Sequence, residues 1–278
     1  MKIHSIILLL SSYILILNIP VYLCARPPNW GCLSLVSPKM QQNYTIGSTF
    51  QSNLQQLLAG LPQKATQNNY FYNATYGEAP DQVYGLIMCY ADTSTAACDS
   101  CMSEASLGIM ECCALNKNGV AWYNECMIRY SDVAVNATNN IGLMGCGPKV
   151  LDSKPESLAE PKKFRDILRQ LFDGLATNAS RSPLRLGAGK MNYTPSANIY
   201  ALAQCTRQLP SDECRMCIGN LTDLGVEYCT GDKAVQADET LMTISCYARF
   251  ALKPFYVISD AHPPWPNSSI TLSLSFFL

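Results

Sequence analysis

Histidine is nearly absent from this sequence, and neither sign of charge is in excess. The two histidines are His4 and His262, so the body of the chain lacks the base of a Ser-His-Asp or Cys-His site and the histidine ligands common at zinc sites. The 20 basic residues balance 21 acidic ones, which leaves no electrostatic footprint for nucleic acid. No Gly-rich phosphate loop is present, and no pair of carboxylates stands out. We therefore expect no enzyme, no cofactor and no metal ion.

Apolar runs mark the two ends of the chain. The run from Ile6 to Ile19 follows a short polar start, which predicts a signal peptide over residues 1–25. The nine residues from Ile270 to Leu278 are too few to cross a bilayer, so we expect no transmembrane span after the signal. Residues 261–278 are interpreted as a short C-terminal tail.

Cysteine and glycosylation sequons are abundant. The chain has 14 cysteines, a density typical of secreted scaffolds and hazardous in a reducing cytosol. Seven Asn-x-Ser/Thr sequons predict N-linked glycans on an exported protein. Their asparagines are Asn43, Asn73, Asn136, Asn178, Asn192, Asn220 and Asn267. Together these features predict a secreted, disulfide-bonded glycoprotein.

An internal repeat organises the cysteines. A Cys-x8-Cys-x2-Cys run occurs twice, 116 residues apart, and three further cysteines of each copy also match, the last after a four-residue insertion in the second copy. The matched sets are Cys32, Cys89, Cys98, Cys101, Cys113 and Cys126, and Cys146, Cys205, Cys214, Cys217, Cys229 and Cys246. The repeat predicts two domains, over residues 26–143 and 144–260.

The apolar pattern repeats as well. Phe50, Leu54, Leu57, Leu58 and Leu61 have the spacing of an amphipathic helix, and the same spacing recurs from Phe164 to Leu175. In both copies a strand-like segment follows, at 83–88 and 198–203, and then a second helix, at about 95–110 and 211–226. Each copy closes on strands ending in Cys-x2-Arg-aromatic. We interpret the aromatic stretch 70–76 as a loop.

Six matched cysteines per copy allow three bridges in each domain, and spacing alone leaves 15 pairings open. Cys112 has no counterpart, so it is either free or linked to another chain, which would make a homodimer through Cys112. The two Cys-x2-Cys pairs allow a thiol–disulfide redox reading. The repeated cysteine upstream of each pair favours separate structural bridges instead.

The tandem Cys-x8-Cys-x2-Cys pattern, with the run from Trp122 to Ser131, resembles the plant cysteine-rich repeat secretory proteins, built from ginkbilobin-homologous (salt-stress/antifungal) domains. The resemblance implies an α+β domain with a five-stranded antiparallel sheet and two helices. The residues themselves offer no catalytic candidates, as argued above. The pairs that the resemblance implies are Cys32–Cys113, Cys89–Cys98 and Cys101–Cys126, then Cys146–Cys229, Cys205–Cys214 and Cys217–Cys246.

The resemblance also points to six positions for sugar binding. In the ginkbilobin type, mannose is held by an Asn after the first cysteine, an Arg seven residues after the fifth and a Glu five residues after the sixth. Here these positions hold Leu33, Val120 and Ser131, and Gly147, Gln236 and Ala251. None keeps the required residue, so we do not expect mannose binding to be inherited.

The leading hypothesis is a secreted, non-enzymatic binding protein of the plant apoplast in defence or stress signalling. Its expected partner is a receptor-kinase ectodomain or a cell-wall carbohydrate. The rival hypothesis is an antifungal carbohydrate-binding effector of the mannose-lectin type. A redox protein that uses the Cys-x2-Cys pairs is the third.

Overall fold

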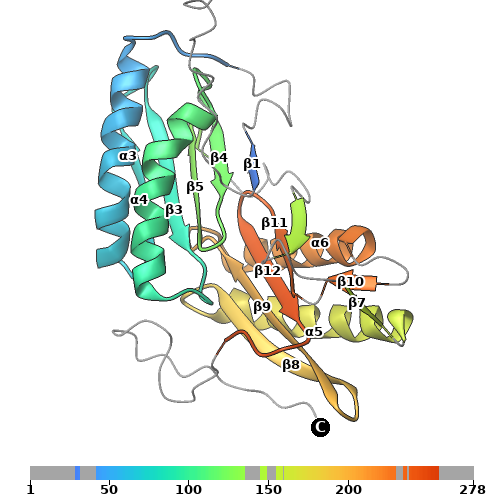
Figure 1. Cartoon of the computed structure of the whole chain (residues 1–278). Coiled ribbons are helices and arrows are strands. Elements are labelled where there is room, and N and C mark those ends of the chain that lie inside the picture. Colours follow the sequence, from blue (N-terminus) through green and yellow to red (C-terminus); the bar gives the residue numbers. More distant parts are fainter. Residues whose placement is uncertain are drawn as a thin grey trace, which may run out of the picture.

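The computed structural model describes residues 29–31, 42–134, 145–148, 155–158, 160–229, 234–236 and 238–256 (Figure 1). These residues form an α+β protein of two tandem domains, each with an antiparallel sheet and two long helices. The predicted signal peptide and the C-terminal tail lie outside the described residues.

The first domain has a sheet in the order β4-β5-β3-β2, and the three-residue strand β1 pairs with the outer edge of β4. All neighbouring strands are antiparallel. The elements are β1 (Asn29–Gly31), α3 (Thr49–Gln67), β2 (Phe71–Tyr76), β3 (Val83–Cys89), α4 (Thr95–Cys112), β4 (Gly119–Trp122) and β5 (Cys126–Ser131).

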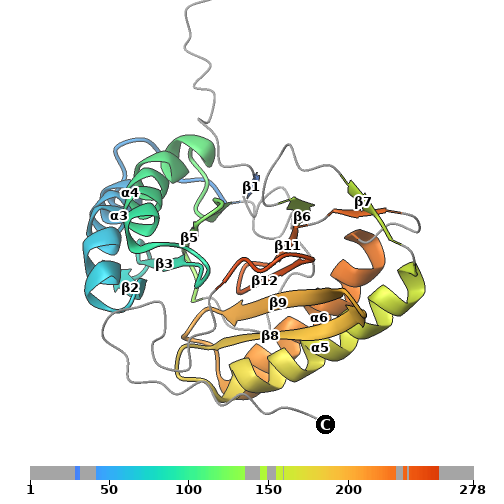
Figure 2. The same ribbon diagram turned by 60° about the horizontal axis from the view of Figure 1, so that its bottom comes forward.

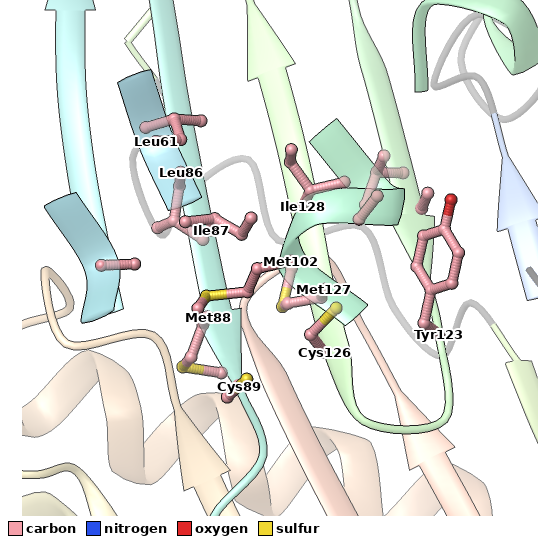
Figure 3. Close-up of a cluster of buried hydrophobic side chains, with 14 of the residues drawn as sticks. Leu61, Leu86, Ile87, Met88, Cys89, Met102, Tyr123, Cys126, Met127 and Ile128 are labelled. Atoms are coloured by element: carbon pink, nitrogen blue, oxygen red, sulfur yellow. The ribbon is translucent and has the colours of Figure 1, made fainter. Parts of the chain in front are cut away.

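Both helices of this domain begin where the sequence supplies a cap. The side chain of Ser48 accepts a hydrogen bond from the backbone N–H of Gln51, and Ser94 does the same for Ala97. The predicted apolar face of α3 is confirmed, since Phe50 and the leucines after it are buried against the sheet. Figure 3 shows the facing β3 and β5, with Ile87, Met88 and Cys89 beside Cys126, Met127 and Ile128.

The second domain repeats this plan. Its sheet has the order β11-β12-β9-β8, with the short β6 on the edge of β11. An additional two-stranded ribbon pairs β10 with β7, and β10 lies in the segment that carries the four-residue insertion. The elements are β6 (Gly145–Pro148), β7 (Pro155–Ser157), α5 (Pro161–Arg181), β8 (Leu186–Thr194), β9 (Ala197–Cys205), α6 (Ser211–Cys229), β10 (Ala234–Gln236), β11 (Asp238–Met242) and β12 (Cys246–Ala251).

The stretch around Asn73, interpreted as a loop from its sequence, is the edge strand β2. Phe71, Asn73 and Thr75 lie on one face of this strand, which is buried at Phe71 and exposed at the other two, and Tyr72 and Ala74 on the opposite face are partly buried. The sequence of this strand lacks the alternation of apolar and polar residues typical of a half-buried strand, since aromatic residues lie on both faces. This prediction was wrong.

The two sheets lie between the two helix pairs. Figure 2 shows α3 and α4 outside one sheet and α5 and α6 outside the other. The sheet faces that are not covered by helices meet each other. One apolar cluster contains Met88 and Met127 of the first domain together with Leu202, Met242 and Tyr247 of the second. The domains therefore share a core.

Candidate binding site at the domain junction

Between cysteines that the structure describes, four of the six disulfides that the resemblance implied are present. Cys89 is joined to Cys98 and Cys101 to Cys126, and the second domain repeats both bridges as Cys205–Cys214 and Cys217–Cys246. The two cysteines of each Cys-x2-Cys pair thus belong to different bridges. This arrangement is structural and leaves no dithiol for redox exchange at either pair.

The prediction that Cys112 is unpaired was wrong. Cys112 ends α4, and both it and the buried Cys113 are disulfide-bonded, as is Cys229. Among the described residues no cysteine is free. The predicted partners Cys32 and Cys146 have no described side chain, so those two pairings stay predictions. Because the Cys112 sulfur is already oxidised, it offers no thiol for the predicted homodimer.

The positions aligned with the family's mannose site are buried wherever the structure describes their side chains. Val120, Ser131 and Ala251 are buried in the sheets, with exposed fractions of 3% or less. Leu33 lies outside the described residues, and of Gly147 and Gln236 only the backbone is described. The strand register also moves one counterpart by four positions, from Gln236 to Thr240, because Thr240 lies opposite Arg249 as Val120 lies opposite Arg129. Gln236 belongs to β10 instead, because the four-residue insertion precedes β11.

The predicted glycosylation sites that the structure describes are all accessible. Their asparagines are exposed, while Asn136 and Asn267 lie outside the described residues. The exposed asparagines are Asn43, Asn73, Asn178, Asn192 and Asn220. Glycosylation at these positions stays a prediction.

The arginine of the repeated Cys-x2-Arg-aromatic motif crosses the domain boundary in both copies. In the first domain, Nη1 of Arg129 donates to the carbonyl of Ile244 at 2.7 Å and to the hydroxyl of Ser245 at 3.0 Å. The indole N–H of Trp122 donates to the carbonyl of Thr243, in the same turn, at 2.9 Å. The β11–β12 turn of the second domain is therefore held by the first.

Arg249, the second copy of the motif, pairs with acids from both domains. It contacts Asp92, whose side chain is fully buried, and its Nε donates to Asp238 at 2.6 Å. The ring of Phe255 lies 4.1 Å from its guanidinium. Burial lowers the pKa of Arg249, but the hydrogen bond to Asp238 and the charge of Asp92 outweigh it and the net shift is upward. Each buried charge here has its counter-ion.

Aromatic and amide contacts complete the junction. The rings of Tyr90 and Tyr247 are stacked with centroids 3.8 Å apart, and burial raises the pKa of both hydroxyls. The amide of Gln204 accepts from the N–H of Ala91 at 3.0 Å and donates to the carbonyl of Cys89 at 3.3 Å. These contacts join β9 and β12 of one domain to the end of β3 in the other.

A third arginine fixes a strained turn across the same boundary. Asn69 and Tyr70 have φ values of 54° and 60°, which non-glycine residues rarely adopt. Arg207 of the second domain donates to the carbonyls of Asn68 and Asn69, at 3.1 and 2.7 Å, and lies over the ring of Phe71. The turn that leads into β2 is therefore stabilised by the other domain.

A pocket of about 150 Å³ opens beside this junction. Its walls come from β2, β3 and β5 of the first domain, and one residue of the second domain closes it. The lining residues are Asn73, Ala74, Thr75, Tyr84, Gly85, Leu86, Arg129, Tyr130, Ala134 and Gln208. The pocket is small, and its lining combines polar and apolar side chains. None of the six positions aligned with the family's mannose site is among its lining residues.

The second domain also buries one carboxylate in its helix-facing core. Glu239 is 3% exposed and lies opposite Phe250 in the β11–β12 ladder. Its counterpart in the first domain is Gly119, where a Cβ would lie 2.5 Å from the ring of Tyr130. Burial, and secondarily the nearby charge of Asp238, raises the pKa of Glu239 from 4.5 to about 7.

Glu239 gives the protein a pH-dependent stability. Because the folded-state pKa is raised, the stabilisation is complete below about pH 4.5 and is lost as the pH rises to about 7. Relative to Glu239→Gln, wild type is expected to lose about 3 kcal/mol of unfolding free energy between pH 4.5 and 7.5, at about 1.4 kcal/mol per pKa unit. Urea denaturation of both proteins at several pH values measures the difference. Parallel pH profiles would contradict this assignment.

Two findings concern possible sites elsewhere. Within the described residues, no helix combines the length and apolar character needed to cross a membrane. In the same residues, no cluster of three or more His, Cys, Asp or Glu side chains is placed to hold a metal ion.

Comparison with known proteins identifies the class, a protein with two tandem copies of one cysteine-rich domain. The family described as salt stress response/antifungal matches residues 32–133 and 146–253. The chain belongs to this family.

Individual relatives agree with this assignment. Cysteine-rich repeat secretory protein 9 of Arabidopsis thaliana is 30% identical over 231 residues, covering 81% of this chain and 67% of the relative. An antimicrobial ginkbilobin-2-like protein of Castanea crenata is 26% identical, over 88% and 95% of the two chains. The chain spans 34% of the length of the cysteine-rich receptor-like protein kinases 25 and 19 that it also matches.

A solved structure shows the same fold. The crystal structure of the tandem DUF26 ectodomain of PDLP8 from Arabidopsis thaliana has a TM-score of 0.61 and 18% identity, and the match covers 81% of this chain and 98% of that one.

The sequence did not predict a candidate site at the junction between the domains. It identified Arg129 and Arg249 as part of a repeated motif but gave them no role. The available signal was a charged residue inside an otherwise apolar closing strand, in both copies. A buried strand tolerates such a residue where a partner satisfies it.

Proposed function

We propose that this chain is a non-enzymatic binding protein of the plant apoplast that acts in defence or stress signalling by docking to a receptor-kinase ectodomain. The observation that supports this proposal most strongly is that the two domains share one core. Tyr90, Tyr247 and the two motif arginines lie at the boundary between the domains. Domains held in this way present a preformed surface, which lowers the entropy cost of docking.

The relatives support an extracellular role for the proposal. One is named a secretory protein, and others are receptor-like kinases that match over a part of their length. The proposal includes a signal peptide over residues 1–25, domains over 26–143 and 144–260, and a tail over 261–278. It also includes five strands and three disulfides in each domain, with Cys32–Cys113 and Cys146–Cys229 as the third pairs.

The rival function, an antifungal carbohydrate-binding effector, is favoured by one observation. The chain matches an antimicrobial ginkbilobin-2-like protein over nearly the full length of that relative. The buried positions Val120, Ser131 and Ala251 oppose inheritance of the mannose site of that type.

Binding measurements on the secreted, unreduced protein separate the two functions. The protein is assayed against immobilised mannan and chitin and, by biolayer interferometry, against a panel of cysteine-rich receptor-like kinase ectodomains. We expect saturable binding to at least one ectodomain, no retention on either polysaccharide, and no binding by a reduced and alkylated control. Retention on mannan or chitin without ectodomain binding would instead establish the effector function.

A further inference from the structure

The pocket at the domain junction contains a buried cation that has no counter-ion among the described residues. Arg129 is 4% exposed and lines the pocket. Its hydrogen bonds all start from Nη1 and end on a carbonyl and a hydroxyl, which leaves Nε and Nη2 unused by the described residues. No described carboxylate lies within ion-pair distance of it, and burial lowers its pKa to about 10. Buried charges in proteins are normally paired.

The repeat supplies a matched comparison, because Arg249 occupies the same motif position and has two acids. The 116-residue shift of the Cys89 segment places Gln208 where the first domain has Asp92. The 120-residue shift of the closing strands places Asn118 where the second domain has Asp238. Both carboxylates that neutralise Arg249 are thus amides at the Arg129 site.

The two sites also differ in what fills them. In the second domain, Phe255 covers Arg249, and Tyr256 lies against Tyr200 and donates to the carbonyl of Gly189. Tyr84 is the counterpart of Tyr200, since each lies opposite the final residue of the closing strand in its own sheet. In the first domain, the corresponding space beside Tyr84 is the pocket itself. Among the described residues, the second domain therefore fills from its own chain a place that the first domain leaves accessible.

We propose that this pocket binds a small sugar acid, with its carboxylate on Arg129 and its hydroxyls on the surrounding amides and hydroxyls. The free Nε and Nη2 of a guanidinium form the fork that grips a carboxylate with two parallel hydrogen bonds. Oε1 of Gln208 is buried without a hydrogen-bond partner among the described residues, so it can accept from a sugar hydroxyl. Asn73 and Thr75 supply further polar groups at the rim, and the volume of about 150 Å³ limits the ligand to one small ring.

This inference rests on the proposed extracellular binding role but not on the docking partner. A chain that binds no receptor ectodomain can still bind the acid, and the reverse also holds. The two tests therefore fail independently.

Isothermal titration on the secreted protein tests the pocket with four probes. D-galacturonate carries the acid and the hydroxyls, D-galactose lacks the acid, and benzoate and benzamide supply a charged and a neutral ring without hydroxyls. We expect saturable binding of galacturonate at least tenfold tighter than that of galactose or benzoate, and no binding of benzamide.

Variants assign the binding to Arg129. Removing Arg129 would also release the 243–245 turn, so the primary variant is Gln208→Glu. This substitution places an acid beside Arg129 at the position that corresponds to Asp92 beside Arg249. The affinity for galacturonate should fall at least tenfold, and circular dichroism should show that the variant remains folded. Gln82→Glu adds the same charge outside the pocket lining and should change the affinity less than twofold.

Several outcomes would overturn the proposal. Absence of saturable galacturonate binding at 10 mM, equal binding of galactose, or tighter binding of benzoate would each do so. Equal loss of affinity in Gln208→Glu and Gln82→Glu would show a general charge effect and contradict the assignment to this pocket.

Discussion

Replacing Asp92 by asparagine is expected to lower the free energy of unfolding by about 3 kcal/mol. The Asp92 side chain is fully buried and Arg249 is 10% exposed, so the substitution leaves a buried guanidinium with one acid in place of two. Breaking a buried pair by removing one partner costs about 3–5 kcal/mol, and the remaining contact with Asp238 places the effect at the lower end. Urea denaturation at pH 7 measures it.

The control for this substitution is Glu227→Gln. Glu227 pairs with Arg169 at 2.9 Å, but the two side chains are 67% and 39% exposed. Exposed pairs contribute about 0–1 kcal/mol, so this variant should be near neutral. Comparable losses in Asp92→Asn and Glu227→Gln would mean that the junction acid is not stabilising the fold.

Truncating Tyr247 to alanine is expected to cost about 3–5 kcal/mol, the usual range for a large buried aromatic residue. Tyr247 is 1% exposed and its ring is stacked on Tyr90 of the other domain. The cavity would therefore lie between the domains, and we expect their unfolding to separate into two steps. Differential scanning calorimetry of the variant measures both the loss of stability and the number of unfolding steps.

Tyr76→Ala is the matched truncation outside the junction. Tyr76 is 44% exposed at the end of β2, so its loss should change the unfolding free energy by less than about 1 kcal/mol and leave the transition single. If Tyr247→Ala behaved like Tyr76→Ala, the stacked pair would not couple the domains.

The repeat made much of the fold predictable. Matching cysteine spacings and apolar positions placed both helices and the central strands of each copy, and the structure confirms α3 and α5 with their apolar faces. Local spacing carries such information because helix periodicity depends on residues a few positions apart. The strand β2 was missed because aromatic residues occupy both of its faces.

The junction was not predictable from the pattern of either copy alone. Arg129 and Arg249 look equivalent in sequence, yet one contacts a turn and the other contacts two acids. The difference lies in Gln208, which is remote from Arg129 in sequence, and in Asn118, which directly precedes β4. Pairing across domains depends on tertiary packing, and periodicity does not encode it.

The central claim is that the two disulfide-bonded domains unfold as one cooperative unit. Differential scanning calorimetry of the unreduced wild-type protein tests it most directly. We predict one transition whose calorimetric enthalpy equals its van't Hoff enthalpy for the whole molecule. Two resolved transitions, or a calorimetric enthalpy about twice the van't Hoff value, would show independent domains and contradict the account.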